Sequence, residues 1–172
     1  YPNATGDYEP TNIQVGMKVN NLINIDDLTT VMQMDFYFKV FWNDSRWYSP
    51  DLFDGLNPEV KTEGIDITAY IRNDDSPLPF YLPDLVFFQT LDLQMVAELV
   101  KLYDGGTVYW SRHFFATFAE PQMNFARYPL DIQNFSFVFQ SYAHDTRFVT
   151  LQPLVPAITY NYDTQQKMNY ID

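Results

Sequence analysis

The chain has no cysteine among its 172 residues. This absence excludes a disulfide framework and any metal site built from thiolate ligands. Long apolar runs are absent as well, because no stretch approaches the roughly 20 apolar residues that a membrane-spanning helix needs. The sequence therefore predicts neither a disulfide-rich module nor a membrane-spanning one.

Basic residues are scarce. The chain has 10 lysines and arginines against 22 acidic residues, which gives a formal net charge of -12. This balance argues against binding to the phosphates of nucleic acid or to an anionic membrane surface, and it favours the attraction of cations. We therefore expect no nucleic acid among the partners of this protein.

Histidine is also rare, with only two in the chain. His113 lies in an apolar, strand-like segment, and His144 stands next to Asp145. Ser141 is close to both His144 and Asp145 in sequence. This spacing, however, does not bring a nucleophile, a base and an orienting carboxylate into the arrangement that catalysis requires. We predict that the protein is not an enzyme and has no catalytic residues.

Acidic pairs occur at residues 26–27 and 74–75. Carboxylates in such turn-like segments usually cap backbone amides, although calcium could use a group of them if the fold brought carbonyl oxygens alongside. We predict no metal-binding residues and no cofactor.

The dominant pattern is alternation. In residues 31–42 every second residue is apolar, as is typical of a strand with one buried face, and residues 13–19 repeat the pattern. The short polar segment between them predicts an antiparallel pair. The predicted core residues are Ile13, Val15, Met17, Val19, Met32, Met34, Phe36, Phe38, Val40 and Trp42.

Further strands are predicted at residues 64–71, 84–90, 95–103, 107–118, 131–142 and 148–155. Proline, glycine and aspartate separate several of them, and Gly105 with Gly106 predicts a hairpin turn. Residues 91–103 also have apolar residues near helical spacing, but their β-branched and aromatic surroundings favour a strand. We predict an all-β fold, a β-sandwich in which residues 1–172 form a single domain.

Three sequons for N-glycosylation occur, at Asn3, Asn43 and Asn134. A sequon can be used only on a surface that faces the secretory lumen. The three together indicate an extracellular protein.

The segment YPLDIQNFS, residues 128–136, resembles the F-P-x-D-x-Q-x-C segment that closes the signature loop of pentameric ligand-gated ion channels, the Cys-loop receptor superfamily. Pro121 and Phe135 stand where the two loop cysteines of the animal receptors would be. The resemblance therefore implies a member that lacks these cysteines and holds the loop by packing.

Other segments match the family in the same order, and the resemblance extends from about Ile13 to about Asp145. FWNDSRW resembles W-x-D-x-R, YLPDLVFFQ resembles W-x-P-D with Tyr81 in place of tryptophan, and DGGTVYWSRHFFATF resembles a D-G-x-V-x-W-S strand pair. The resemblance implies the immunoglobulin-like sandwich of the nicotinic receptor ligand-binding domain.

The family binds its agonist between adjacent subunits in a box of aromatic rings, and such rings suit a cationic ligand. The resemblance implies that Phe88 and Tyr142 belong to one subunit's side of the box and Tyr37 to the complementary side. Tyr109 is a further candidate on the complementary side. The expected ligand is a small molecule, with a cation favoured by the rings and the acidic charge.

The resemblance also implies two loops that couple ligand binding to the pore. Asp26 and Asp27 match the loop between the first two strands, and Tyr128, Pro129 and Asp131 lie in the signature loop. The sequence suggests that Tyr128 enters an apolar site facing the membrane, and that Asp131 pairs with a cation or caps backbone amides.

The family continues with two more strands, a loop that caps the ligand and four membrane helices. We therefore expect this chain to be part of a longer subunit that forms a homo- or hetero-pentamer at the extracellular face of a membrane and contacts the membrane through other segments. Two alternatives remain open: a binding or scaffold protein of the same fold without a channel, and an enzyme or glycan-binding module on an unrelated sandwich.

Overall fold

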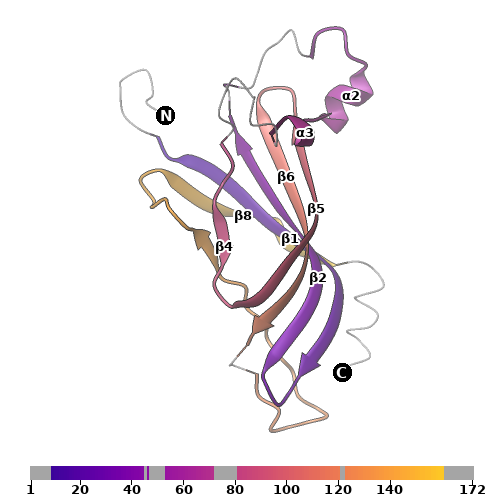
Figure 1. Ribbon diagram of the computed structural model, residues 1–172, viewed down its shortest axis with the longest axis vertical. Helices are drawn as coiled ribbons and strands as arrows, with labels where there is room; N and C mark the ends of the chain where they lie inside the picture. The colour runs from indigo at the N-terminus through magenta and orange to yellow at the C-terminus, as the bar shows by residue number, and fades with distance from the viewer. Residues whose placement is uncertain (1–8, 45, 47–52, 72–80, 121–122, 161–172) are drawn as a thin grey trace.

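The computed structural model describes residues 9–44, 46, 53–71, 81–120 and 123–160. Six strands form a large sheet in the order β3-β5-β6-β2-β1-β8, and β4 pairs with β7 in a small one (Figure 1). The strands are β1 Thr11–Asp26, β2 Val31–Asn43, β3 Ile65–Asp66, β4 Leu85–Phe87, β5 Thr90–Leu102, β6 Thr107–Ala119, β7 Phe139–Ser141 and β8 Val149–Tyr160. The helices whose bounds the structure describes, α2 Pro58–Glu63 and α3 Thr68–Ile71, lie between β2 and β4 in the chain. The all-β prediction is confirmed.

The predicted hairpin of the first two strands is confirmed. β1 and β2 are antiparallel, with Met17 opposite Phe38 and Val19 opposite Phe36. The apolar residues that alternate along both strands share one face of the sheet because side chains of a strand point to opposite faces in turn. All ten of the predicted core residues are buried.

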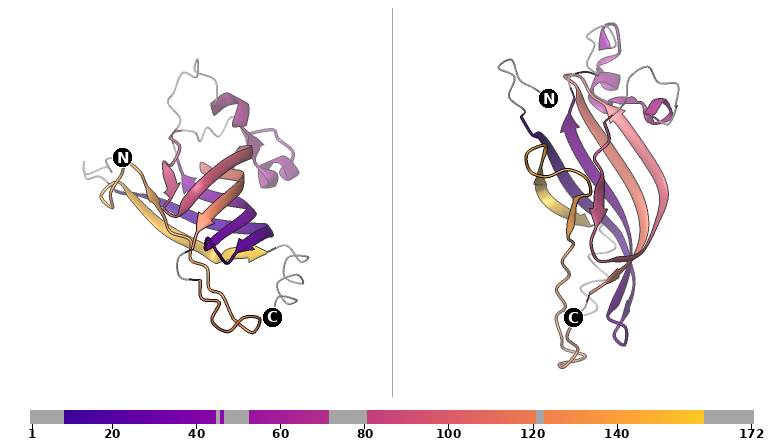
Figure 2. Two further views of the ribbon diagram at one scale, coloured as in Figure 1. Left: turned by 60° about the horizontal axis from the view of Figure 1, so that its bottom comes forward. Right: turned by 60° about the vertical axis from the view of Figure 1, so that its left-hand side comes forward.

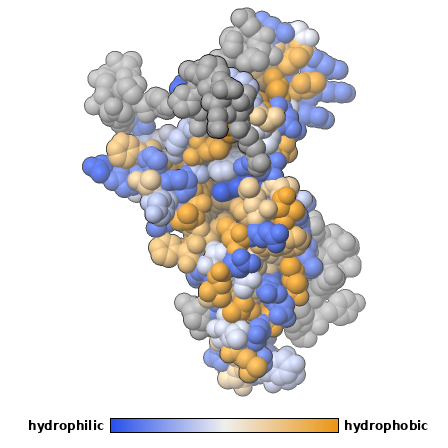
Figure 3. All heavy atoms as spheres, viewed as in Figure 1, coloured by the Kyte–Doolittle hydropathy of each residue, from blue (hydrophilic) through white to orange (hydrophobic). Residues whose placement is uncertain are grey.

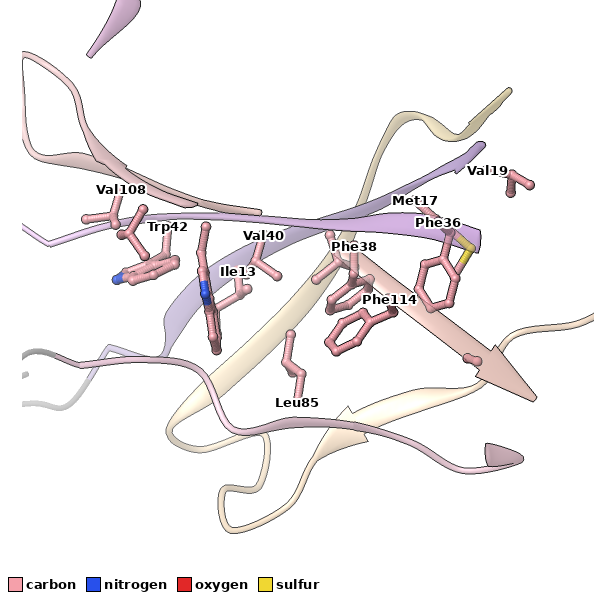
Figure 4. Close-up of a cluster of buried hydrophobic side chains, with 14 of the residues drawn as sticks. Ile13, Met17, Val19, Phe36, Phe38, Val40, Trp42, Leu85, Val108 and Phe114 are labelled. Carbon is pink, nitrogen blue, oxygen red and sulfur yellow. The ribbon is translucent and has the colours of Figure 1, made fainter. Parts of the chain in front are cut away.

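The two sheets meet through aromatic side chains. Phe36 and Phe38 of the large sheet contact Phe87 of β4 edge to face, with ring centroids 5.7 Å and 4.9 Å apart. Phe139 of β7 lies 5.4 Å from Phe38. Figure 4 shows the side chains of β2 projecting together toward Leu85 of β4. This contact makes the fold a sandwich and leaves the other face of each sheet turned outward.

The predicted strand at 64–71 is largely wrong. Only β3, two residues long, pairs with β5, and residues 68–71 form α3. The Asp66 carboxylate accepts hydrogen bonds from the Thr68 amide at 2.9 Å and the Thr68 hydroxyl at 2.6 Å. These bonds satisfy donors at the start of the helix and favour it over continued extension.

The predicted strand at 131–142 is confirmed only at β7. Residues 131–138 lie outside both ladders although their exposure still alternates. Their amides find side chains instead, since the Ser136 amide donates to Glu120 at 3.4 Å and the Val138 amide to Gln89 at 3.3 Å. The alternation in sequence therefore indicated correctly which side chains of this segment face the core. It did not indicate whether the segment pairs with another strand. The predicted strand at 84–90 is likewise reduced to β4.

The strand predicted over residues 91–103, the predicted hairpin turn and the last predicted strand agree more closely with the structure. Residues 91–102 belong to β5, so the strand interpretation is confirmed except at Tyr103, and the hairpin at Gly105 and Gly106 joins β5 to β6 with positive φ at both glycines. β8 begins at Val149, one residue after the predicted start, runs on past the predicted end to Tyr160, and pairs with β1 in parallel. Helix α2 was not predicted, although Asn57 caps it and Pro58 occupies its first turn, which are known signals of a helix start.

Candidate functional site

Phe88 and Tyr142 lie at the two ends of the small sheet. The Phe88 amide donates to the Val138 carbonyl and the Tyr142 amide to the Asp84 carbonyl, each at 2.9 Å. Because Phe87 and Phe139 point into the core, the alternation of the strands turns Phe88 and Tyr142 outward. Phe88 is 63% exposed and Tyr142 is 80% exposed. Both rings are therefore available to a partner outside this chain.

Asp84 fixes the segment that carries Tyr142. Its carboxylate accepts hydrogen bonds from the Ser141 hydroxyl at 2.6 Å and the Ala143 amide at 2.5 Å, and the His144 ring nitrogen Nδ1 lies 3.5 Å away. Burial raises the pKa of Asp84, but these three hydrogen bonds outweigh it and hold the pKa below its usual value. The carboxylate thus ties the end of β7 to the start of β4.

Tyr37 and Tyr109 lie on the outward face of the large sheet. Tyr37 of β2 stacks on His113 of β6 with ring centroids 4.5 Å apart, and Tyr109 of β6 stacks on Phe41 of β2 at 4.6 Å. Each stack joins two residues that are opposite each other in the β2–β6 register. The two tyrosines are four register positions apart, which corresponds to about 13 Å along the strands.

The four predicted box residues therefore divide into two pairs on opposite sides of the sandwich. Phe88 and Tyr142 face outward from the small sheet, whereas Tyr37 and Tyr109 face outward from the large one. All four lie in the described part of the chain, and no ring contact joins one pair to the other. One copy of the chain cannot close a box from these rings, but two copies could if the small sheet of one approached the large sheet of the other.

His113 has a second contact that ties it to the sheet. Its ring nitrogen Nε2 lies 2.6 Å from Oδ1 of Asp35, which also accepts a hydrogen bond from the Asn20 side-chain amide at 3.2 Å. The His113 and Asp35 side chains are 17% and 19% exposed. Tyr37 thus rests on an imidazole that a carboxylate holds in place.

The two predicted coupling loops lie together at one end of the molecule. Figure 1 and the right panel of Figure 2 both place the tip of the β1–β2 hairpin and the loop around residues 124–134 at the lower end. Both carry exposed apolar side chains, and such residues are visible among polar ones at this tip in Figure 3. The most exposed are Leu28 (91%), Tyr128 (78%), Leu130 (82%) and Ile132 (85%).

Carboxylates shape both loops. Asp26 accepts hydrogen bonds from the amides of Leu28 and Thr29 at 2.9 Å and 3.2 Å, which close the hairpin, while Asp27 lies in the turn. Hydrogen bonds from the Thr29 side chain and from these two amides lower the pKa of Asp26. Asp131 accepts a hydrogen bond from the Gln133 side chain. Its partner in the structure is thus an amide side chain, in place of the cation or backbone amide that the sequence suggests.

At its C-terminal end, around Phe135, the signature loop is held by packing. Phe135, which stands in place of the second loop cysteine, packs half-buried against the core cluster. Pro121, in place of the first, lies outside the described residues. Gln133 also bridges the loop, because its side chain accepts from the Asn124 amide at 3.0 Å and donates to the Asn124 carbonyl at 2.9 Å.

Two of the three sequons can be placed. Asn134 is exposed. Asn43 ends β2 and is exposed as well, but its side-chain amide donates to the Gly105 carbonyl at 3.0 Å, a bond that a glycan would disturb. Asn3 lies outside the described residues.

The structure brings Ser141 and His144 to a carboxylate, but not in a catalytic arrangement. The Ser141 hydroxyl donates to Asp84, and the His144 backbone amide donates to the Ser141 hydroxyl oxygen at 3.0 Å. Asp145 is paired with Arg147 at 2.6 Å instead of orienting His144. The imidazole is therefore not placed to take a proton from this hydroxyl.

Other kinds of site are not evident in the described ranges. No group of three or more His, Asp or Glu side chains there is placed to hold a metal ion. Nor does any helix among those residues have the length and apolar character to cross a bilayer. An apolar cavity of about 250 Å³ lies between β1, β8, Phe38 and residues 135–139, and none of the predicted box residues lines it.

Sequence reasoning missed Asp35 and Asp84, the two carboxylates that support the aromatic residues. Asp84 belongs to the W-x-P-D match, and this match could have marked it as a functional residue. Its hydrogen-bond partners could not be predicted, because they are 57 to 60 positions away in the chain. Asp35 gave no signal, because its partner His113 lies 78 positions away on another strand.

Comparisons with known proteins agree with the geometry. The family model for the neurotransmitter-gated ion-channel ligand binding domain matches residues 2–171. The neuronal acetylcholine receptor subunit beta-3 is 26% identical in the rat and 27% identical in humans over 146 residues, which cover 81% of this chain and 28% of each receptor subunit. An acetylcholine-gated chloride channel subunit of Caenorhabditis elegans, acc-1, is 22% identical over 148 residues, or 83% of this chain and 29% of that subunit. The chain thus spans less than a third of the length of these relatives.

Proposed function

Because the chain belongs to the neurotransmitter-gated ion-channel ligand-binding domain family, we propose that it binds a small ligand between neighbouring subunits and so gates an ion pore. This family comprises binding domains of ligand-gated channels and not enzymes. The proposal includes a pentamer at the cell surface, with the ligand-binding domain on the extracellular side and the membrane contacted through other segments.

The position of the aromatic residues carries this proposal. Two exposed rings, Phe88 and Tyr142, face outward from the small sheet, and Tyr37 and Tyr109 face outward from the large sheet. A box that needs both pairs forms only where two subunits meet. The attraction of a cation to each ring face is about 0.5 to 2 kcal/mol, which favours a small amine as the ligand.

The coupling loops support the second half of the proposal. Apolar side chains as exposed as Leu28 and Ile132 are costly in water when they gather at one tip, and they suit contact with an apolar partner. We assign Asp26, Asp27, Tyr128, Pro129 and Asp131 to the surface that meets the membrane-spanning part of the subunit. The net charge of -12 would concentrate cations near such a pore.

Binding of a quaternary amine to the assembled, full-length protein tests the box. Phe88→Ala and Tyr142→Ala should each weaken binding by about tenfold, which corresponds to roughly 1.4 kcal/mol for the loss of a cation–ring contact. Val155→Ala is a matched control, since it removes a highly exposed apolar side chain (97%) on β8, which belongs to neither the box nor the coupling loops. Unchanged affinity in both aromatic variants would sink the assignment of these residues.

The sequons test the extracellular assignment separately. We propose that Asn3, Asn43 and Asn134 accept glycans, with Asn134 the more accessible of the two described sites. Expression in a eukaryotic host should add mass that an N-glycanase removes, and Asn134→Gln should remove one step of that mass. A protein with no glycan under these conditions would contradict the assignment.

A further inference from the structure

Glu120 is one of the few polar residues that are buried in the described part of the chain. It is 3% exposed and follows directly after β6. Within the described ranges no lysine or arginine forms an ion pair with it, and its carboxyl group accepts a single hydrogen bond, from the Ser136 amide at 3.4 Å. Such a group lowers the free energy of unfolding relative to an apolar side chain of similar size. Stability therefore does not account for a glutamate at this position.

The backbone and side chain of Glu120 together reach both candidate coupling loops. Its amide donates a hydrogen bond at 2.8 Å to the carbonyl of Thr30, the last residue of the turn between β1 and β2. Its carbonyl accepts from the Met123 amide at 3.2 Å, near the start of the signature loop. Its carboxyl group accepts from the Ser136 amide, directly after the loop ends at Phe135. Among the described residues, no other is hydrogen-bonded to both loops.

Each of the two loops is held together by hydrogen bonds of its own. In the signature loop, the Gln133 side chain bridges to the amide and the carbonyl of Asn124. In the β1–β2 hairpin, Asp26 closes the turn by accepting from two backbone amides. A displacement at the base of either loop is therefore passed on to the rest of that loop, and Glu120 lies at the base of both.

We propose that the Glu120 side chain couples the β1–β2 hairpin to the signature loop, so that a displacement of one loop moves the other. This inference rests on the proposed function, in which the two loops meet the membrane-spanning part of the subunit. Because Glu120 is buried and acts through the loops, it is a positioning residue. The bond to Ser136 is the one that a substitution can remove, since the bonds to Thr30 and Met123 are made by the backbone.

Gln89 offers a matched comparison for Glu120. Its side-chain oxygen accepts a hydrogen bond from the Val138 amide at 3.3 Å, close in length to the bond between Glu120 and Ser136. Gln89 lies between β4 and β5, however, and within the described ranges it has no hydrogen bond to the β1–β2 hairpin. Gln89→Leu therefore removes a similar bond but no link to the hairpin. Glu120→Leu removes that link, and Glu120→Gln keeps an oxygen acceptor.

A fluorine label reports the coupling without any ligand. In the full-length assembled protein, 3-fluorotyrosine placed at position 128 of the signature loop should change its ¹⁹F shift when Asp26→Ala opens the hairpin turn. This response should be lost in Glu120→Leu and retained in both Glu120→Gln and Gln89→Leu. A label that ignores Asp26→Ala in the otherwise wild-type protein would overturn the inference, as would a response that persists in Glu120→Leu or is lost equally in Gln89→Leu.

A double-mutant cycle on channel opening gives the functional readout. Asp26→Ala in the hairpin and Leu130→Ala in the signature loop should each change the concentration of tetramethylammonium that opens half of the channels. The effect of both together should depart from the product of the single effects by about threefold, as is typical of coupled residues. The departure should vanish in Glu120→Leu and remain in Gln89→Leu. Effects that simply multiply in the wild-type background would contradict the inference.

The two proposals fail in different ways. If tetramethylammonium opens no channel, the proposed gating by a small amine is wrong, and the fluorine label, which needs no ligand, decides alone whether Glu120 couples the loops. If tetramethylammonium opens the channel but the cycle is the same in Glu120→Leu as in the wild type, the gating stands and the positioning role of Glu120 is wrong.

Discussion

Asp84 is the residue on which the geometry around Tyr142 depends most. It receives hydrogen bonds from Ser141 and Ala143 and lies near the His144 ring, and so it connects β4 to the segment after β7. The small sheet has only three register pairs, so one carboxylate with several partners is a large part of what holds its end. Loss of the Asp84 carboxylate should therefore lower the stability of the domain and also alter the position of Tyr142.

Asp84→Asn should lower the stability of the domain by about 1 kcal/mol, because charge-assisted hydrogen bonds become neutral ones in a partly exposed site. The pKa of Asp84 is lower in the folded state than its usual value. Its contribution is therefore present above the unfolded pKa of about 3.9 and is lost as the pH falls through the folded value. Denaturant unfolding of both proteins at pH 7 and in acid measures this.

The difference between the wild type and Asp84→Asn should shrink in acid. Asp92→Asn, an exposed carboxylate on β5, serves as the matched control and should change stability by less than about 0.5 kcal/mol. An Asp84→Asn protein as stable as the wild type at pH 7 would show that the small sheet does not depend on this carboxylate.

At the scale of elements, the pairing of β8 with β1 has a tight point at Gly16. A Cβ atom added there would lie 2.7 Å from Cδ1 of Leu154 and 3.2 Å from the Ala157 carbonyl oxygen. The register of β1 and β8 is also interrupted at this point, between Val15 and Met17. A side chain at position 16 must therefore push the two strands apart or displace Leu154.

Gly16→Ala should destabilise the domain by about 1 to 3 kcal/mol, the usual cost of overpacking. The change should appear as a lower midpoint of denaturant unfolding and as faster hydrogen exchange of β8 amides. Gln14→Ala, two residues earlier and exposed, should have an effect below about 0.5 kcal/mol. Equal stability of Gly16→Ala and the wild type would mean that β8 adjusts freely at this contact.

The elements also show what the sequence could predict. β1, β2 and β6 are long and have one buried face that dictates their alternation, so local pattern was sufficient for them. β5 is exposed over most of its length, and its β-branched and aromatic surroundings were the signal that favoured a strand. Residues 131–138 alternate equally well, yet Glu120 and Gln89 replace a partner strand for two of their amides. Strand pairing depends on distant residues, and no local pattern contains that information.

The same limit applies to the site at the scale of the whole molecule. Motif resemblance led to the prediction that Phe88, Tyr142 and Tyr37 line the box, and the structure places all three on outward faces. It could not predict that Tyr37 stacks on His113, because that contact depends on the β2–β6 register. Nor could it predict which faces of the sandwich the two pairs occupy, which follows only from how the sheets pack.

A ring of five subunits is the expectation for the full-length protein. Two outward faces on opposite sides of one sandwich are suited to a head-to-tail contact, and such contacts close into rings when the rotation between subunits permits. A row of exposed apolar residues along β5 adds surface that assembly would cover. It consists of Leu91 (63% exposed), Leu93 (40%), Met95 (47%) and Val96 (49%).

Subunit counting on the purified native protein tests this expectation, with electron microscopy averages viewed down the symmetry axis and a native mass. A closed ring of five would support the pentamer, and in such a ring we expect the small sheet of each subunit to lie against the large sheet of the next, so that the two aromatic pairs meet. A monomer would leave all four rings in water, and a filament would join the faces without closing. Either result would contradict the pentamer, and the monomer would also remove the shared box from the proposed function.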